Sequence, residues 1–132
     1  MLPPGIHDAT LPEIEIRYGT NDRRRPLLEG FIRGTQALSI AGCKTVYLNG
    51  SFISIKPLPG DFDACWDPTG VDGALIDPVL LDFTNKREAQ KKKYGGEFFP
   101  SSSKANGILT FLEYFQIDKD TGKSKGIIRV HL

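Results

Sequence analysis

The spacing of apolar residues in the first third of the chain predicts two helices. Thr10-Leu-Pro-Glu13 matches a capping box with proline in the first turn, and it predicts a short helix that stops at Gly19. A longer helix is expected after it, capped by Asn21 or Asp22 and ended by Gly42. The buried side of this longer helix is formed by residues that recur at helical spacing: Leu27, Leu28, Phe31, Thr35 and Leu38.

After Gly42 the pattern changes from helical spacing to the composition and alternation typical of strands. Lys44–Asn49 predicts a first strand, and Phe62–Trp66 predicts a second, in which successive residues alternate between two faces. The loop between them, with Pro57, Pro59 and Gly60, is too long for a tight hairpin turn. Gly126–Leu132 predicts the last strand of the chain.

The rest of the second half predicts a mixture of helices and a short strand. A helix is expected over residues 77–94, with Asp77 as its N-cap and a glycine pair at its end. Glu97–Phe99 predicts a short strand, and helical spacing favours a helix over Asn106–Gln116, although alternation in that segment also fits a strand. The resulting order predicts an α/β (α+β) fold, a small mixed sheet with helices packed on it.

Length and composition agree with one globular domain. We expect a single domain over residues 1–132, in which residues 1–22 form an N-terminal extension with the short helix. The net charge of +1 argues neither for nor against nucleic-acid binding, because only local patches matter when the sum is near zero. The N-terminus lacks a signal-peptide pattern, and no apolar run approaches the roughly 20 residues that span a bilayer. We therefore expect a cytoplasmic protein with no membrane partner, in which Cys43 and Cys65 are reduced core residues.

The most informative chemistry lies between the first two predicted strands. Gly50 allows the backbone to approach a ligand closely, and Ser51 offers a hydroxyl and a backbone N–H. Asp61 and Asp63, two residues apart on a strand, project from the same face. Two neighbouring carboxylates repel each other unless a cation lies between them, and Mg²⁺ is a usual cation for such oxygen pairs.

The helix predicted over residues 77–94 has a basic second half. Pairing at i,i+4 between Asp82 and Lys86 and between Glu88 and Lys92 removes part of its charge. The remainder fits either a solvated face or a contact with a triphosphate, an RNA or an acidic partner. The basic residues of this segment are Lys86, Arg87, Lys91, Lys92 and Lys93.

The arrangement of these motifs resembles the nucleotidyltransferase fold of the DNA polymerase beta superfamily. The resemblance lies in a helix, a strand that ends in Gly-Ser, nine intervening residues and Asp-x-Asp at the next strand, and it covers mainly residues 23–67. The nearest group by this pattern is the bacterial minimal nucleotidyltransferases. The whole chain is also similar to a little-characterised small bacterial branch of that group, through segments such as Leu-Pro-Pro-Gly-Ile-His, Tyr-Leu-Asn-Gly-Ser-Phe and Lys-Tyr-Gly-Gly-Glu-Phe-Phe-Pro.

The resemblance implies a nucleotide site with two divalent ions. Gly50 and Ser51 would contact the phosphates of a nucleoside triphosphate (NTP). Asp61 and Asp63, with a third carboxylate, would bind two Mg²⁺ ions. Relatives often have an arginine soon after Gly-Ser, and Lys56 is the residue expected to supply that positive charge here.

The third carboxylate should stand on a strand beside the Asp-x-Asp strand. Glu97 is the first choice, because it opens a predicted strand after the long helix, and Glu113 is the second. His131 stands on the last strand, where a carboxylate would otherwise serve. If that strand were the neighbour of the Asp-x-Asp strand, the site would lack its third acid.

The implied activity is Mg²⁺-dependent transfer of a nucleoside monophosphate from an NTP to a protein or RNA acceptor. The small size of the chain favours a macromolecular acceptor that brings its own surface, and the resemblance implies a setting within a bacterial toxin–antitoxin or defence pair. The alternative is a catalytically weak or inactive binding module that acts as an antitoxin or regulator of a partner protein such as a toxin. A purely structural α/β domain is the third interpretation of the same pattern.

Overall fold

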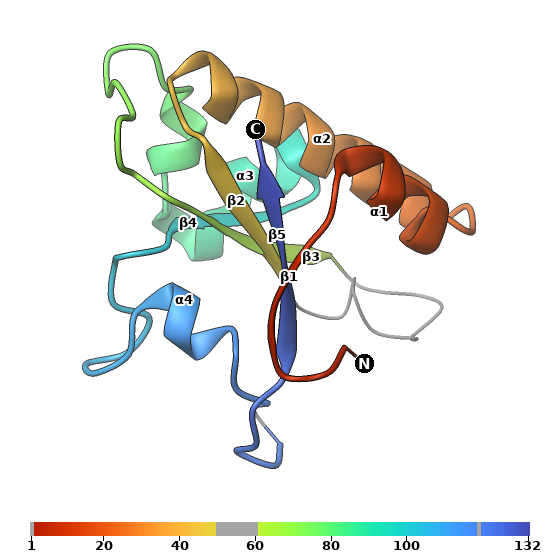
Figure 1. Ribbon diagram of the computed structural model, residues 1–132. Helices are drawn as coiled ribbons and strands as arrows, with labels where there is room; N and C mark the ends of the chain where they lie inside the picture. Colours follow the sequence, from red (N-terminus) through yellow and green to blue (C-terminus); the bar gives the residue numbers. More distant parts are fainter. Residues whose placement is uncertain (1, 50–60, 119) are drawn as a thin grey trace.

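The computed structural model describes residues 2–49, 61–118 and 120–132, which form a mixed sheet with helices packed on it (Figure 1). The five strands have the order β1-β5-β2-β3-β4, with β1–β5 and β3–β4 parallel and the other two pairs antiparallel. This confirms the predicted α+β fold class. The elements are β1 (Gly5–Asp8), α1 (Leu11–Tyr18), α2 (Arg24–Ile40), β2 (Thr45–Asn49), β3 (Phe62–Trp66), η2 (Pro78–Leu81), α3 (Thr84–Tyr94), β4 (Gly96–Pro100), α4 (Phe111–Tyr114) and β5 (Gly126–His131).

The first two helices begin as the sequence predicts. Thr10 and Glu13 form the capping box of α1, since the side chain of each accepts a hydrogen bond from the backbone N–H of the other. Asn21, rather than Asp22, caps α2, because its Oδ1 accepts from the N–H groups of Arg23 and Arg24 at 3.0 and 2.8 Å.

No helix in the parts of the chain that the structure describes is both long and apolar enough to cross a membrane.

The main core lies between one face of the sheet and the helices α1, α2 and α3 (Figure 1). At its centre Phe31, Phe62 and Phe98 are fully buried, and their rings meet edge to face, with centroids 5.5 Å apart for Phe31–Phe62 and 5.3 Å for Phe62–Phe98. Gly96 is required here, because a Cβ at this position would lie 2.5 Å from the carbonyl oxygen of Phe62. This close packing fixes the pairing of β3 with β4.

The opposite face of the sheet is covered in part by α4. A smaller apolar cluster lies there, formed by Tyr47, Cys65, Phe99, Phe115 and Ile127. Cys43 and Cys65 are both buried and carry free thiols, as the sequence predicts. Burial raises the pKa of the Cys65 thiol far above its ordinary value, which keeps the thiol protonated.

The prediction of one continuous helix over residues 77–94 is wrong. Asp77 does cap a helical turn, accepting from the N–H of Val79, but that turn is the short 3₁₀ helix η2. Asp82 then has extended backbone and its side chain accepts from both the N–H and the hydroxyl of Thr84, which starts a new turn. The first part of α3 is left-handed, with φ of 50°, 56° and 60° at Asn85, Lys86 and Arg87.

The helix predicted over Asn106–Gln116 is also much shorter in the structure. The side chain of Asn106 accepts from the N–H groups of Ile108 and Leu109, and this local turn competes with helix formation. The helix α4 begins only after Thr110, which forms a capping box with Glu113.

The strand β1 lies in the segment that the sequence predicts as an N-terminal extension. Residues 5–8 pair in parallel with β5, so that Asp8 stands beside Arg129. Four residues at a sheet edge, with one glycine among them, carry too little alternation to be recognised as a strand.

Candidate metal centre

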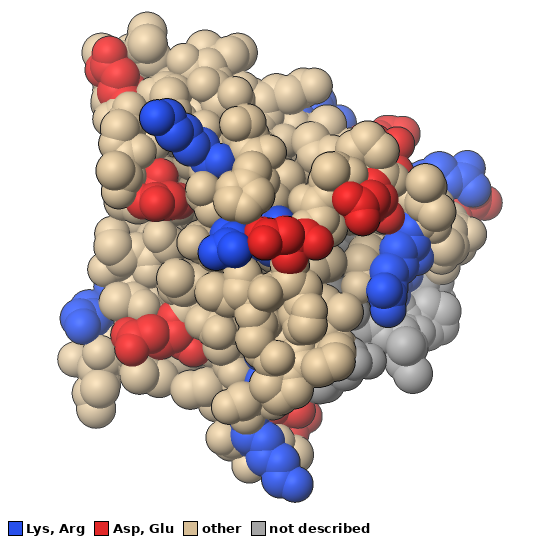
Figure 2. All heavy atoms as spheres, in the orientation of Figure 1, with Lys and Arg blue, Asp and Glu red and all other residues tan. Residues whose placement is uncertain are grey.

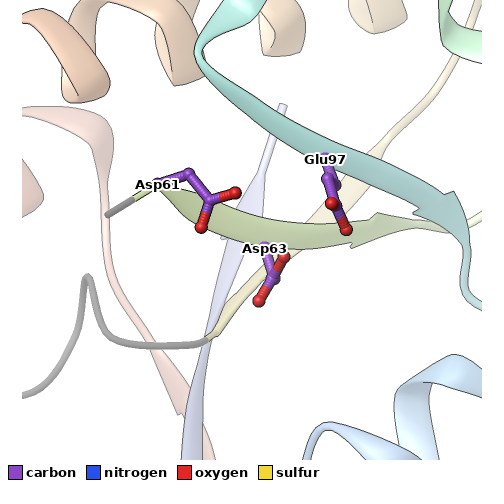
Figure 3. Close-up of side chains that lie close together, drawn as sticks. All are labelled: Asp61, Asp63 and Glu97. Carbon is purple, nitrogen blue, oxygen red and sulfur yellow. The ribbon is translucent and has the colours of Figure 1, made fainter. Parts of the chain in front are cut away.

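Three carboxylates meet at the end of β3 and β4 where both strands begin (Figure 3). Asp61 directly precedes β3, Asp63 is the second residue of β3, and Glu97 is the second residue of β4. Each of the three offers a carboxylate oxygen, and these oxygens all lie within 4.8 Å of one another. Such a group can hold a metal ion between two strands.

The sheet register explains why these three residues come together. Asp63 and Glu97 are register partners on parallel neighbouring strands, so their side chains leave the same face side by side. Asp61 stands two residues before Asp63, which points it to that face as well. Burial, and next the negative charge of Glu97, raise the pKa of Asp61 above its ordinary value. The protein therefore holds these carboxylates together against their mutual repulsion.

Two cations from α3 contact the third carboxylate. The Nζ of Lys91 lies 3.0 Å and the Nη2 of Arg87 lies 3.4 Å from Oε1 of Glu97, whose residue is only 9% exposed. The guanidinium of Arg87 also lies 5.5 Å from the ring centre of Phe99, a cation–π distance. The protein itself therefore partly neutralises Glu97.

Asn49 adds a neutral oxygen beside the acids. It is the register partner of Asp63 on the antiparallel strand β2, so its side chain projects from the same face. The residue is 5% exposed, and its Oδ1 is buried with no hydrogen-bond partner among the residues that the structure describes. A buried carbonyl oxygen normally has a partner, and a cation at the three carboxylates would supply one.

Of the residues predicted for the site, the structure brings together Asp61, Asp63 and Glu97. Gly50, Ser51 and Lys56 lie outside the described residues. In the sequence, the Gly-Ser step follows the last residue of β2 directly.

The second choice for the third carboxylate, Glu113, is wrong. Its Oε1 accepts from the N–H and hydroxyl of Thr110, and these hydrogen bonds lower its pKa. His131 is also remote from the acids, because β5 pairs with β1 and β2, and its Nε2 lies 3.1 Å from Oδ1 of Asp8. The neighbours of β3 are β2 and β4, so the last strand does not occupy the place of the third acid.

Sequence reasoning did not connect Asn49 with the site. It offered the basic run that contains Arg87 and Lys91 as one possible contact with a triphosphate, but nothing in the sequence tells which of these cations reach Glu97. The sequence signal that could have pointed to Asn49 is its position directly before the Gly-Ser step.

The ligand set favours a hard divalent cation. Carboxylate and carbonyl oxygens suit Mg²⁺, Mn²⁺ or Ca²⁺, whereas Zn²⁺ sites in proteins usually include histidine or cysteine. The group found among the described residues contains only carboxylates, and the neighbouring thiol of Cys65 is protonated and buried. The residues therefore fit the Mg²⁺ that the sequence pattern implies.

Fold and site together define a small α+β protein with a three-carboxylate group between parallel strands. Over residues 1–131 the chain matches the family described as "Family of unknown function (DUF6932)", and it belongs to that family. Comparison with curated proteins and comparison with solved structures each found no match.

Proposed function

We propose that this protein is a divalent-metal-dependent nucleotidyltransferase that acts on an NTP and a protein or RNA hydroxyl. The observation that carries the proposal is the grouping of Asp61 and Asp63 with Glu97 of the adjacent strand, with oxygens within 4.8 Å of one another. The resemblance of the Gly-Ser and Asp-x-Asp spacing to nucleotidyltransferases supports the same function. We expect this chemistry in the cytoplasm of a bacterium.

The proposed reaction needs no protein nucleophile. The acceptor oxygen forms a bond to the α-phosphorus of the NTP, the bond from that phosphorus to the bridging oxygen breaks, and pyrophosphate leaves while the hydroxyl proton passes to water. Bound Mg²⁺ ions supply Lewis-acid activation of the hydroxyl and charge stabilisation at the phosphates. Asp61, Asp63 and Glu97 would hold these ions, and Gly50 and Ser51 are proposed to contact the phosphates.

The face that Figure 2 displays carries no broad basic area, since its acidic and basic side chains stand in small separate groups. Extended nucleic-acid interfaces normally carry a dominant positive stripe. This face therefore does not favour an extended contact with an RNA acceptor.

Calorimetry with ATP and Mg²⁺ tests the binding half of the proposal. We expect the wild-type protein to bind and the double variant Asp61→Ala, Asp63→Ala to lose binding. Asp22→Asn is the matched control, because it removes a fully exposed carboxylate that lies outside the group. Failure to bind any NTP would contradict the proposed function.

Transfer itself is tested with NTPs labelled at the α-phosphate. Incubation with a bacterial lysate should label a protein or RNA, and the double aspartate variant should not. Label in both samples would show that another enzyme is responsible.

A second candidate is a nucleotide-binding module with little or no turnover, acting as an antitoxin or regulator of a partner protein such as a toxin. The observation that favours it is the pairing of Glu97 with both Lys91 and Arg87, which reduces the charge available to a second ion. Nucleotide binding without label transfer would favour this candidate over the enzyme.

A further inference from the structure

The cations beside Glu97 are only partly used by the contacts that the structure describes. Arg87 makes a single contact of 3.4 Å rather than the two-pronged pairing typical of an arginine with a carboxylate. Its Nε is buried and has no hydrogen-bond partner among the described residues. The side chain of Lys91 is 40% exposed, and its ammonium group has three donors, of which the 3.0 Å contact to Glu97 uses one.

The two cations of α3 both contact one of the three carboxylates. Lys91 and Arg87 contact Glu97, and the charges of Lys91 and Arg23 also act on Asp61. The buried Oδ1 of Asn49, which has no hydrogen-bond partner among the described residues, lies on the same face as Asp63 and points to a cation as a further component. A divalent ion bound there would satisfy these oxygens, and it would repel Lys91 and Arg87 at close range.

A displaced cation needs a new anion close by. A divalent ion bound at the carboxylates would also coordinate the phosphates of a nucleotide. These phosphates would therefore lie next to the ion and would be the nearest new anions. Arginine and lysine are the side chains best suited to bind phosphate oxygens, the first through its fork of donors and the second as a compact charge.

We propose that Lys91 and Arg87 are polyphosphate-binding residues that exchange Glu97 for the phosphate oxygens of an NTP when a divalent cation binds. This inference rests on the proposed function, because it takes the nucleotide as the ligand. It assigns a binding role to two residues of α3 that the Gly-Ser and Asp-x-Asp motifs do not include. In the ligand-free protein the same two residues act as counter-ions of Glu97.

The exchange predicts that one substitution changes two affinities in opposite directions. In Lys91→Gln a cation that competes with the metal is removed, so the affinity for Mn²⁺ alone should rise about threefold, as expected for a partly exposed ion pair. The affinity for a non-hydrolysable ATP analogue in the presence of Mg²⁺ should fall at least about tenfold, because a charge-assisted hydrogen bond to phosphate is lost. Inorganic triphosphate with Mg²⁺ should show the same loss, which separates phosphate contacts from base contacts.

The chain offers a matched control on the same helix. Lys92 pairs with Glu88 at 3.2 Å and is 77% exposed, so Lys92→Gln removes the same charge away from Glu97. Both affinities of Lys92→Gln should stay within about twofold of wild type. Lys91→Arg should retain analogue binding, and Arg87→Gln should change the two affinities in the same directions as Lys91→Gln.

The outcomes separate this inference from the proposed function. If wild type binds Mn²⁺ but no NTP analogue, both are overturned. If wild type binds the analogue and Lys91→Gln and Arg87→Gln match Lys92→Gln, only the exchange is overturned. If Lys91→Gln loses affinity for Mn²⁺ and analogue together, Lys91 supports the shape of the site and does not exchange partners.

Discussion

Two ionic clusters lie on the same face of the sheet, one at the β1–β5 edge and one at the β3–β4 edge. In the first, the single carboxylate of Asp8 accepts from Nε and Nη2 of Arg129 at 2.7 and 3.0 Å and lies 3.1 Å from Nε2 of His131. The hydrogen bonds from Arg129 are the main cause that lowers the pKa of Asp8 to about 2. In this cluster the carboxylate of Asp8 is paired by side chains of the protein itself.

The second cluster is arranged differently. Three carboxylates lie close together, Lys91 and Arg87 both contact Glu97, and burial together with Glu97 raises the pKa of Asp61. The Asp8 cluster stands on paired strands, whereas Arg87 of the second cluster stands on a left-handed turn. The comparison teaches that a charge cluster by itself is no sign of a ligand, whereas carboxylates held together at a partly buried position, one of them with a raised pKa, are a better sign.

The strongest way to break this comparison is to remove one carboxylate from each cluster. Asp63→Asn should lower the affinity for Mn²⁺ at least about 100-fold, because losing a ligand costs more than losing an outer partner. Asp8→Asn should leave that affinity within about twofold. Titration with Mn²⁺ followed by electron paramagnetic resonance measures both, and an equal loss in the two variants would contradict the assignment of the site.

The acid response of the Asp8 cluster provides a second test. The folded-state pKa of Asp8 lies below its ordinary value of 3.8, at about 2, so the cluster stabilises the fold above pH 4. This contribution is lost as the pH falls from about 4 to about 2. Asp8→Asn should therefore have a lower Tm than wild type at pH 7, and the two should converge by about pH 2. Thermal unfolding across this range measures the difference, and a constant gap would contradict the assignment.

The left-handed turn beside the candidate metal centre gives a third, smaller effect. Lys86 has φ of 56°, a conformation that costs most side chains energy and glycine none, so Lys86→Gly should stabilise the protein by about 0.5 kcal/mol. Lys92 lies in the right-handed part of α3, where the same change should destabilise by about 1 kcal/mol. Urea unfolding of the two variants measures these values, and equal destabilisation would argue against the left-handed turn.

The grouping of carboxylates at the candidate metal centre predicts the smallest change. Asp61→Asn removes one negative charge, so without metal it should stabilise the protein at pH 7 by about 0.5 kcal/mol, a value reduced by solvent screening. With saturating Mn²⁺ the order of the two stabilities should reverse, so that the wild type is more stable than Asp61→Asn, because the wild type gains more from ligand binding. Unfolding with and without Mn²⁺ measures both signs, and an unchanged order would contradict an ion at Asp61.

Much of the fold was predictable because local chemistry specifies it. The capping box at Thr10 and the alternation in Phe62–Trp66 each depend on neighbours in the chain, and both are confirmed. The errors occur where two local preferences compete. Asp82 and Asn106 divert backbone N–H groups into turns, and the helical spacing around them does not reveal which hydrogen bond is more favourable.

The site was predictable in part for a related reason. Asp61 and Asp63 are close in the sequence, so alternation alone places them on one face. Glu97 was the preferred third acid because it begins a strand, and the structure places it beside them. Choosing between Glu97 and Glu113 required knowing that β4, and not the segment after it, pairs with β3.

The sequence by itself determined the strands β2, β3 and β5, the first two helices and the pair Asp61 and Asp63, because each depends on short-range periodicity and capping. Only the tertiary structure decided which strand lies beside β3, which cations reach Glu97 and that Asn49 faces the acids. These are contacts between distant segments, fixed by packing such as that of Gly96 against Phe62. The grouping of carboxylates that suggests a ligand is a property of that packing, and it does not exist in any segment alone.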